Sequence, residues 1–217
     1  MTLPWIPIIV VGGTLVYVFR RPRKKRMRLF QDIGDYFAYP YELCDVWKAA
    51  SKLTSNPGVY AWYFDSPPTN VPVKDCIRVD GWILLYVGIA TKNIRKRILD
   101  QHFQGNAYGS TLRLSLGCLL NDALSIRLQR IGRSKKRLTF GQEGEVKLSK
   151  WMAKHARVAW RDDVKKFRSK RFLEGLEEFI VQERYSLPLN IDHNKKHPFY
   201  DKLKKIRKYC KEQALQS

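Results

Sequence analysis

Two short runs of aromatic and β-branched residues constrain most strongly what this chain can fold into. The first reads GVYAWYF at residues 58–64, and the second reads WILLYVGIA at residues 82–90. Runs of this length and composition are typical of buried β-strands. Each contains a tyrosine close to a glycine, Tyr60 in GVY and Tyr86 in YVG, and glycine inside a strand allows close approach of a ligand or of backbone. We therefore predict two neighbouring strands that carry the tyrosines at comparable positions.

The rest of the pattern predicts helices and one more short strand around this pair. Apolar residues recur at helical spacing, or follow helix-capping residues, in several segments. The expected helices lie at about residues 41–53, 93–103, 112–124, 143–154, 172–185 and 199–213, and the third strand lies at 156–160. Residues 31–54 otherwise read as a connector, and residues 132–141 read as a basic loop. The expected fold class is α+β, with a short, mostly antiparallel central sheet flanked by helices.

The first nineteen residues carry no charge, and seven of the next nine are arginine or lysine. About twenty apolar residues cross a bilayer as a helix, and cations that follow such a segment favour the cytoplasmic side. We predict a transmembrane helix at 1–19, a basic segment at 20–28 that contacts anionic lipid, and the remainder in the cytoplasm. Two prolines and a Gly-Gly pair weaken this helix, so a soluble cytoplasmic protein is the alternative. The predicted divisions are 1–19 (anchor), 20–54 (basic segment and connector), 55–194 (domain) and 195–217 (basic C-terminal helix).

The net charge of the chain is +21, from 41 lysines and arginines against 20 aspartates and glutamates. This imbalance predicts a polyanionic partner, which is nucleic acid, an anionic membrane surface, or both. The four cysteines are widely separated and form no CxxC or Cys/His metal pattern, which argues against a disulfide framework or a zinc site. No protein partner can be inferred from the sequence.

Cationic side chains follow the second strand at once. Arg95, Arg97 and His102 share the predicted helix at 93–103. At 3.6 residues per turn Arg95 and His102 share a face, whereas Arg97 lies about 140° from His102. An arginine at the end of a strand, close to a tyrosine hydroxyl, can hold a phosphate in a bidentate fork. The alternative is a set of solvated surface charges.

Carboxylates gather on the predicted helix at 172–185. Glu174, Glu177 and Glu178 lie there beside apolar residues. They are either salt-bridge partners or ligands for a hard cation, since Mg²⁺ typically binds one or two carboxylates and keeps several waters. Asn190, which follows Pro188, could orient such a site.

Taken in order, these elements resemble the GIY-YIG nuclease domain family. The resemblance is carried by GVY at 58–60, YVG at 86–88, the Arg and His of the following helix, a helical glutamate and PLN at 188–190. It covers roughly residues 56–192. The segments GNAYGSTLRLSLGCLL and LPLNIDHNKKHPF further resemble a bacterial-type subgroup, which extends the similarity to about Arg207.

The resemblance implies a small α/β domain that binds one divalent cation, Mg²⁺ or Mn²⁺, and hydrolyses a phosphodiester bond. Tyr60 or Tyr86 would help to activate the attacking water, and Arg97 would stabilise charge on the phosphate. His102 would assist proton transfer, and Asn190 would brace the site. The cation would bind the helical glutamate, Glu178. Contacts with nucleic acid are expected from Arg95, Lys96 and Arg113.

Two departures from the family pattern leave choices open. The gaps from Tyr86 to Arg97 and from Arg97 to His102 are each one residue longer than in compact members, so Arg95 is an alternative to Arg97. Glu178 lies at the usual distance before Asn190, but Glu177 better shares the apolar face of its helix and is the alternative ligand.

Three functional hypotheses remain open at this point. The first is a metal-dependent endonuclease, tethered to a membrane, that acts on nucleic acid, with DNA favoured over RNA. The second is a nucleic-acid-binding module of the same fold that does not cleave. The third is a scaffold at a membrane surface whose charge serves lipid binding alone.

Overall fold

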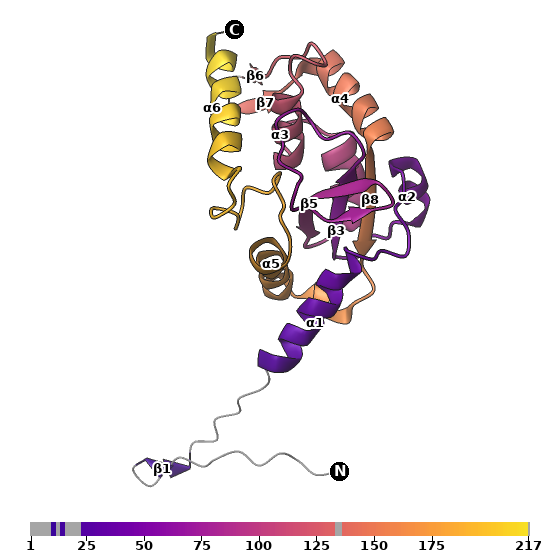
Figure 1. The fold of residues 1–217 in the computed structure, drawn as a ribbon, viewed down its shortest axis with the longest axis vertical. Helices are drawn as coiled ribbons and strands as arrows, with labels where there is room; N and C mark the ends of the chain where they lie inside the picture. Colours follow the sequence, from indigo (N-terminus) through magenta and orange to yellow (C-terminus); the bar gives the residue numbers. More distant parts are fainter. Residues whose placement is uncertain (1–9, 12–13, 16–22, 133–135, 217) are drawn as a thin grey trace.

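The computed structural model describes residues 10–11, 14–15, 23–132 and 136–216. Within these residues the centre of the fold is a four-stranded sheet with the order β4-β5-β3-β8 (Figure 1). Its strands are β4 (Arg78–Val79), β5 (Trp82–Ala90), β3 (Gly58–Phe64) and β8 (Ala156–Arg161). The predicted α+β class and the three predicted strands are confirmed, and every strand pair of this sheet is antiparallel.

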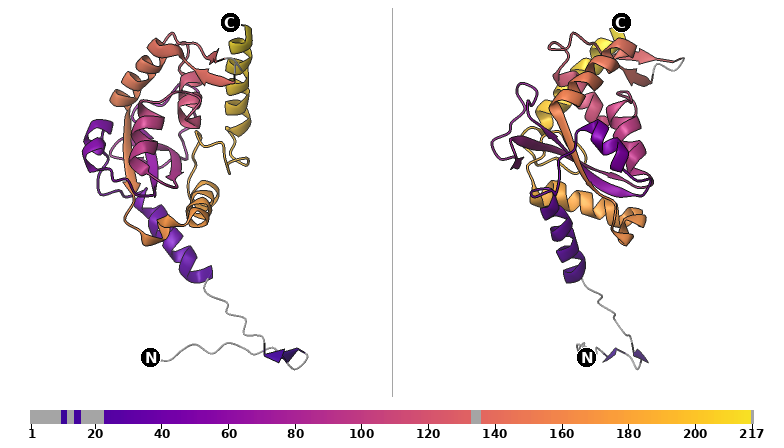
Figure 2. Two further views of the ribbon diagram at one scale, coloured as in Figure 1. Left: turned by 180° about the vertical axis from the view of Figure 1, so that it is seen from behind. Right: turned by 90° about the vertical axis from the view of Figure 1, so that its right-hand side faces the viewer.

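Helices cover both faces of the sheet (Figures 1 and 2). One face carries α2 (Val46–Lys52), η1 (Lys96–Phe103), α3 (Thr111–Leu119) and α4 (Gly141–His155). The other carries α1 (Arg23–Tyr36), α5 (Lys170–Phe179) and η3 (Ile180–Arg184). Along β3, Tyr60 and Trp62 pack towards the first group, whereas Val59 and Ala61 pack towards the second. Because both faces are covered, all seven residues of β3 are buried, which explains its continuous apolar sequence.

The C-terminal part of the chain adds a helix on the side of α3. Helix α6 (Tyr200–Gln216) contacts α3 and buries Leu203 and Cys210. Near it, β6 (Gln129–Ile131) and β7 (Arg137–Thr139) form an antiparallel pair, and the short η2 (Lys165–Arg168) precedes α5. All four cysteines are free and buried.

Two sequence expectations about local structure are wrong. The predicted connector at 31–54 begins inside α1. This helix was not predicted because its first half consists mostly of basic residues and shows no apolar periodicity. Phe30 and Ile33 on this helix, and Phe37 just after its end, are almost fully buried, and the Phe30 ring packs edge-on against Phe172 of α5 at 5.1 Å. The predicted loop at 132–141 contains β7, which is too short to show an alternating pattern.

The predicted membrane-spanning segment, residues 1–19, lies almost entirely outside the described residues. The four described residues within it form two short strands, β1 (Val10–Val11) and β2 (Thr14–Leu15), which pair antiparallel. These four residues are therefore not helical. Of the helices that the structure describes, none combines the length and the apolar character needed to cross a bilayer.

Candidate active site

Tyr60 and His102 form the buried centre of the candidate site. Tyr60 comes from β3 and His102 from η1, and neither side chain is exposed to solvent. The Tyr60 Oη atom lies 2.5 Å from His102 Nε2, a strong hydrogen bond. The Tyr86 ring completes the group, with its centroid 6.5 Å from that of Tyr60 and 5.9 Å from that of His102. The structure therefore brings the two predicted tyrosines and the predicted histidine together.

A β-bulge turns Tyr86 towards Tyr60. The register of β3 with β5 shifts between Trp62 and Tyr63, and Leu85 is the residue of β5 that has no partner. A bulged residue re-aims the side chains that follow it. Leu85 and Tyr86 consequently both pack on the face that carries Tyr60, although strict alternation would place them on opposite faces.

Gly88 provides the space that the Tyr60 phenol occupies. Tyr60 pairs with Gly88 across the two strands, and a Cβ atom at position 88 would lie 2.5 Å from Tyr60 Oη and 2.8 Å from its Cζ. Any other residue there would push the phenol away from His102. The glycine of the YVG triplet is thus required by the tyrosine of the GVY triplet.

We expect Gly88→Ala to lower the free energy of unfolding by about 1–3 kcal/mol, the usual cost of overpacking a core. Chemical denaturation measures the loss, with Gly175→Ala as the matched control. A Cβ at position 175 of α5 would have its nearest contact at 3.6 Å, so that variant should unfold at the same denaturant concentration or a higher one. Equal stability of Gly88→Ala and the wild type would contradict the packing described here.

Arg97 and Arg95 point in different directions. The Arg97 Nε atom donates to Tyr60 Oη at 3.2 Å, and its Nη1 donates to Gln101 Oε1 at 2.6 Å and to the Gly109 carbonyl at 3.3 Å. The Arg95 guanidinium instead donates to the Ala50 carbonyl in α2. Of the two arginines that the sequence left open, Arg97 is therefore the one beside the tyrosines.

A π-helix explains how Arg97 reaches the same group as His102. Hydrogen bonds in η1 run between residues five apart, as in the bond from Gln104 N to the Leu99 carbonyl at 2.8 Å. In such a helix, residues five positions apart are joined by hydrogen bonds and lie closer to the same face than in an α-helix. The expected angle of about 140° between Arg97 and His102 assumed 3.6 residues per turn and is wrong for this helix.

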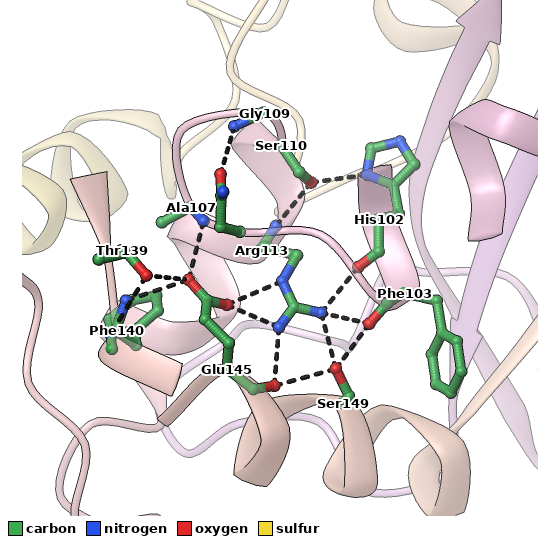
Figure 3. Close-up of polar contacts among 12 residues, drawn as sticks. His102, Phe103, Ala107, Gly109, Ser110, Arg113, Thr139, Phe140, Glu145 and Ser149 are labelled. Atoms are coloured by element: carbon green, nitrogen blue, oxygen red, sulfur yellow. Dashed lines mark hydrogen bonds and ion pairs between the residues drawn. The ribbon is translucent and has the colours of Figure 1, made fainter. Parts of the chain in front are cut away.

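Ser110 holds the other side of the imidazole. Its Oγ lies 2.6 Å from His102 Nδ1 and also accepts the backbone N–H of Arg113 at 3.1 Å, which caps α3 (Figure 3). Burial lowers the pKa of His102 well below its ordinary value, and the nearby cations of Arg97 and Arg113 lower it further. His102 is therefore a neutral imidazole at physiological pH.

Glu177 is the acidic member of the site. Burial raises its pKa to about 7, the Asp192 carboxylate adds to the rise, and the Arg97 cation opposes it. The charge of Glu177 also acts on both Tyr60 and Tyr86. Glu178 is exposed, and its carboxylate contacts Gln182 at 3.5 Å. Of the two glutamates, Glu177 is the one that lies near the tyrosines.

Asn190 ties the loop after η3 to strand β5. Its Oδ1 accepts the Val87 N–H at 3.0 Å, and its Nδ2 donates to the Val87 carbonyl at 2.7 Å. Val87 lies between Tyr86 and Gly88, so this pair of hydrogen bonds fixes the backbone at the centre of the site. The sequence analysis predicted that Asn190 braces the site, and its two hydrogen bonds to Val87 are consistent with that role.

Arg113 does not reach the surface. Its side chain is fully buried, and its guanidinium donates to the Glu145 carboxylate and to the His102 carbonyl, among other acceptors (Figure 3). A guanidinium without exposed surface is not available to a phosphate. The structure therefore does not support the expected contact of Arg113 with nucleic acid, whereas Lys96 is exposed at the rim of a depression of about 440 Å³ that Arg97 also lines.

Two charged residues near the site, Asp192 and Arg207, were not among the site residues predicted from the sequence. Asp192 is exposed two positions after Asn190 and raises the pKa of Glu177. Arg207 of α6 interacts electrostatically with Asp192 and Tyr86, and its buried Nη1 has no hydrogen-bond partner among the described residues. The PLN segment pointed to this loop, but nothing in the sequence placed α6 beside it.

Glu177 and Asp192 are the residues that could hold a divalent cation. No group of three or more His, Cys, Asp or Glu side chains gathers as a metal site in the described part of the chain. A pair of carboxylates is enough for Mg²⁺, which keeps several of its waters. Burial and a second carboxylate make the Glu177 anion unfavourable without a cation, so the donor set fits one.

In EDTA, we expect Glu177→Gln to stabilise the protein at pH 8 but not at pH 4. A carboxyl whose pKa rises from 4.5 to about 7 on folding binds more protons in the folded state, so stability falls as pH rises through that window. At about 1.4 kcal/mol per pKa unit, the gain from the amide is at most about 3 kcal/mol above pH 7. Thermal unfolding at the two pH values measures it. A variant less stable than the wild type at pH 8 would contradict this account.

A family model described as the GIY-YIG catalytic domain matches residues 58–209. The matched range begins at the first residue of β3 and ends within α6, so it contains every site residue described above. No match to this chain was found among curated proteins or among solved structures.

Proposed function

Because the chain belongs to the GIY-YIG catalytic domain family, whose members are endonucleases, we propose that it hydrolyses phosphodiester bonds in nucleic acid with the help of a divalent cation. The observation that carries the proposal is the convergence of His102 and Arg97 on the hydroxyl of Tyr60. A neutral base, a phenol and a fixed cation in contact can accept a proton from water and stabilise negative charge.

Tyr60 and His102 move the proton in this mechanism. Burial raises the pKa of Tyr60 well above its ordinary value, so the phenol does not ionise alone at neutral pH. The neutral His102 accepts the phenol proton at Nε2 while Oη takes a proton from the attacking water. Arg97 Nε, 3.2 Å from Oη, stabilises the negative charge that develops on that oxygen.

Glu177, with Asp192 beside it, holds the cation in this proposal. A bound Mg²⁺ or Mn²⁺ supplies a Lewis acid that draws charge from the scissile phosphate. Glu177 takes the place of Glu178, the first choice from the sequence, because only Glu177 is close to Arg97 and the tyrosines. Asn190 keeps the strand that carries Tyr86 in position.

Lys96 and the general positive charge would hold the nucleic-acid backbone. Lys96 is exposed beside Arg97, and the net charge of +21 gives binding that is independent of sequence and weakened by salt. Arg95 donates to Ala50 and would contribute through its charge alone. We expect DNA as the substrate, and RNA serves as the comparison in the test.

Tethering to a membrane stays a prediction of the sequence. It is supported by the uncharged residues 1–19 and by Lys24, Lys25, Arg26 and Arg28, whose side chains are exposed at the start of α1. We expect the full chain to float with anionic liposomes even at high salt, whereas residues 23–217, which keep these cations, should float only at low salt.

Supercoiled plasmid and a structured RNA, each incubated with the full chain in Mg²⁺, Mn²⁺ or EDTA, test the nuclease proposal. We expect nicked and then linear DNA in either metal and intact DNA in EDTA. Plasmid that is retarded in a gel but intact in every buffer would overturn the proposal and favour a non-cleaving binding module. Liposome binding without retardation would favour a membrane-surface scaffold.

A further inference from the structure

A hydrogen bond between His102, the candidate base, and Ser110 joins the two ends of the loop between η1 and α3. His102 lies near the end of η1, and Ser110 lies at the start of α3. Ser110 is only 1% exposed, and its Oγ is 2.6 Å from Nδ1 of the imidazole. The imidazole is therefore held at both ring nitrogens, by Ser110 on one side and Tyr60 on the other.

The hydrogen-bonding capacity of these groups favours one tautomer. A neutral imidazole carries one N–H donor and one acceptor nitrogen. A phenol is a much more acidic donor than an aliphatic hydroxyl, so the Tyr60 O–H is the stronger donor to a ring nitrogen. His102 then accepts from Tyr60 at Nε2 and donates its Nδ1 proton to Ser110, whose Oγ also accepts the Arg113 backbone N–H.

A buried ion pair fixes the loop that carries Ser110 (Figure 3). The Arg113 guanidinium donates to the carbonyls of His102 and Phe103 at the end of η1 and pairs with Glu145 Oε2 at 2.6 Å. The other oxygen of Glu145 accepts the Ala107 N–H at 3.0 Å, in the middle of the loop. Burying two charges costs desolvation energy that is offset only when their hydrogen bonds are met. Here they are met by the segments that flank His102.

We propose that Ser110 is a positioning residue that holds His102 in its Nδ1-protonated tautomer, with Nε2 free to accept the Tyr60 proton, and that the Arg113–Glu145 pair holds Ser110 in place. The inference rests on the proposed function, because it concerns the same imidazole. It assigns to the cap of α3 and to the buried ion pair a role in the reaction. Without Ser110, the imidazole samples both tautomers, and only one of them accepts a proton from Tyr60.

The first readout does not require cleavage. The full chain is labelled with ¹⁵N-histidine, and the His102 signals are identified among the four histidines by their loss in His102→Gln. We expect Nδ1 protonated and Nε2 as the acceptor in the wild type and in Ser110→Thr. In Ser110→Ala we expect shifts that report a mixture of tautomers. Unchanged His102 signals in Ser110→Ala would overturn the inference even if the protein proves inactive.

The second readout is the split between kcat and KM in plasmid cleavage. We expect Ser110→Ala to lower kcat about 10- to 100-fold with KM within about threefold, and Ser110→Thr to restore most of the rate. Asp45→Ala is the matched control, because Asp45 caps α2 in the same way, through the Lys48 N–H, and is not hydrogen-bonded to His102 in the described part of the chain. A similar loss of kcat in Asp45→Ala would show a stability effect and overturn the positioning role.

Discussion

Replacing Glu177 with alanine is expected to abolish metal-dependent cleavage, with a loss of at least about 10³-fold in kcat. Glu177 is the carboxylate whose charge interacts with Arg97, Tyr60 and Tyr86 together. Asp192, the other carboxylate nearby, is exposed, and we expect it not to hold the cation on its own. Calorimetric titration with Mn²⁺ should show binding to the wild type and none to the variant at the same pH.

Glu178→Ala is the matched control for this prediction. It removes the neighbouring carboxylate on the same helix. The Glu178 carboxylate is exposed and accepts a hydrogen bond from Gln182. We expect its cleavage rate to stay within about threefold of the wild type, as for most surface substitutions. If Glu178→Ala were inactive and Glu177→Ala active, the metal would bind the exposed carboxylate, and the arrangement proposed here would be wrong.

Arg97→Ala is expected to lower kcat by about 10²- to 10³-fold, the usual effect of removing one group that stabilises transition-state charge. Arg97 is the guanidinium that donates to Tyr60 Oη, so its removal affects both the phenol and the phosphate. Lysine at this position should restore little, because a compact ammonium group lacks the planar fork whose separate nitrogens reach Tyr60, Gln101 and Gly109. Single-turnover cleavage separates this effect from that of product release.

Arg95→Ala removes the same charge two residues away and serves as the control. Its guanidinium reaches the Ala50 carbonyl and not the tyrosines, so we expect a small change in KM and in salt dependence and an unchanged kcat. Equal losses of kcat in the two variants would mean that the arginines act through total charge. A loss confined to KM in Arg97→Ala would limit that residue to binding.

The strands and the neighbouring tyrosines could be predicted because their evidence is local. Runs of aromatic and β-branched residues specify β3 and β5, and the short distance between them in the chain favours pairing. The bulge at Leu85 could not be predicted, because it depends on which residue of β5 lacks a partner in β3. Alternation alone would have placed Tyr86 on the wrong face of the sheet.

The choice of arginine and of glutamate depended on helix type. Both η1 and η3 are π-helices, in which each turn takes up one residue more than an α-helical turn. In η1 the extra residue lets Arg97 and His102 share a face. In η3, which lies between the glutamates and Asn190, it changes the rotation of the chain between the two ends of the segment. The family spacing pointed first to Glu178 and left Arg95 as an alternative to Arg97, whereas the structure places Glu177 and Arg97 near the tyrosines.

The sequence by itself determined the elements that local composition encodes: two tyrosine-bearing strands, the helices that follow them, and a strongly basic chain. Only the tertiary structure decided which charged groups meet. It buried Arg113 against Glu145, turned Arg95 away, and brought Glu177 and Arg207 to the tyrosines from helices distant in the chain. The physical reason is that strand and helix formation depend on neighbouring residues, whereas the environment of a charge depends on the packing of whole elements and on single-residue shifts within them.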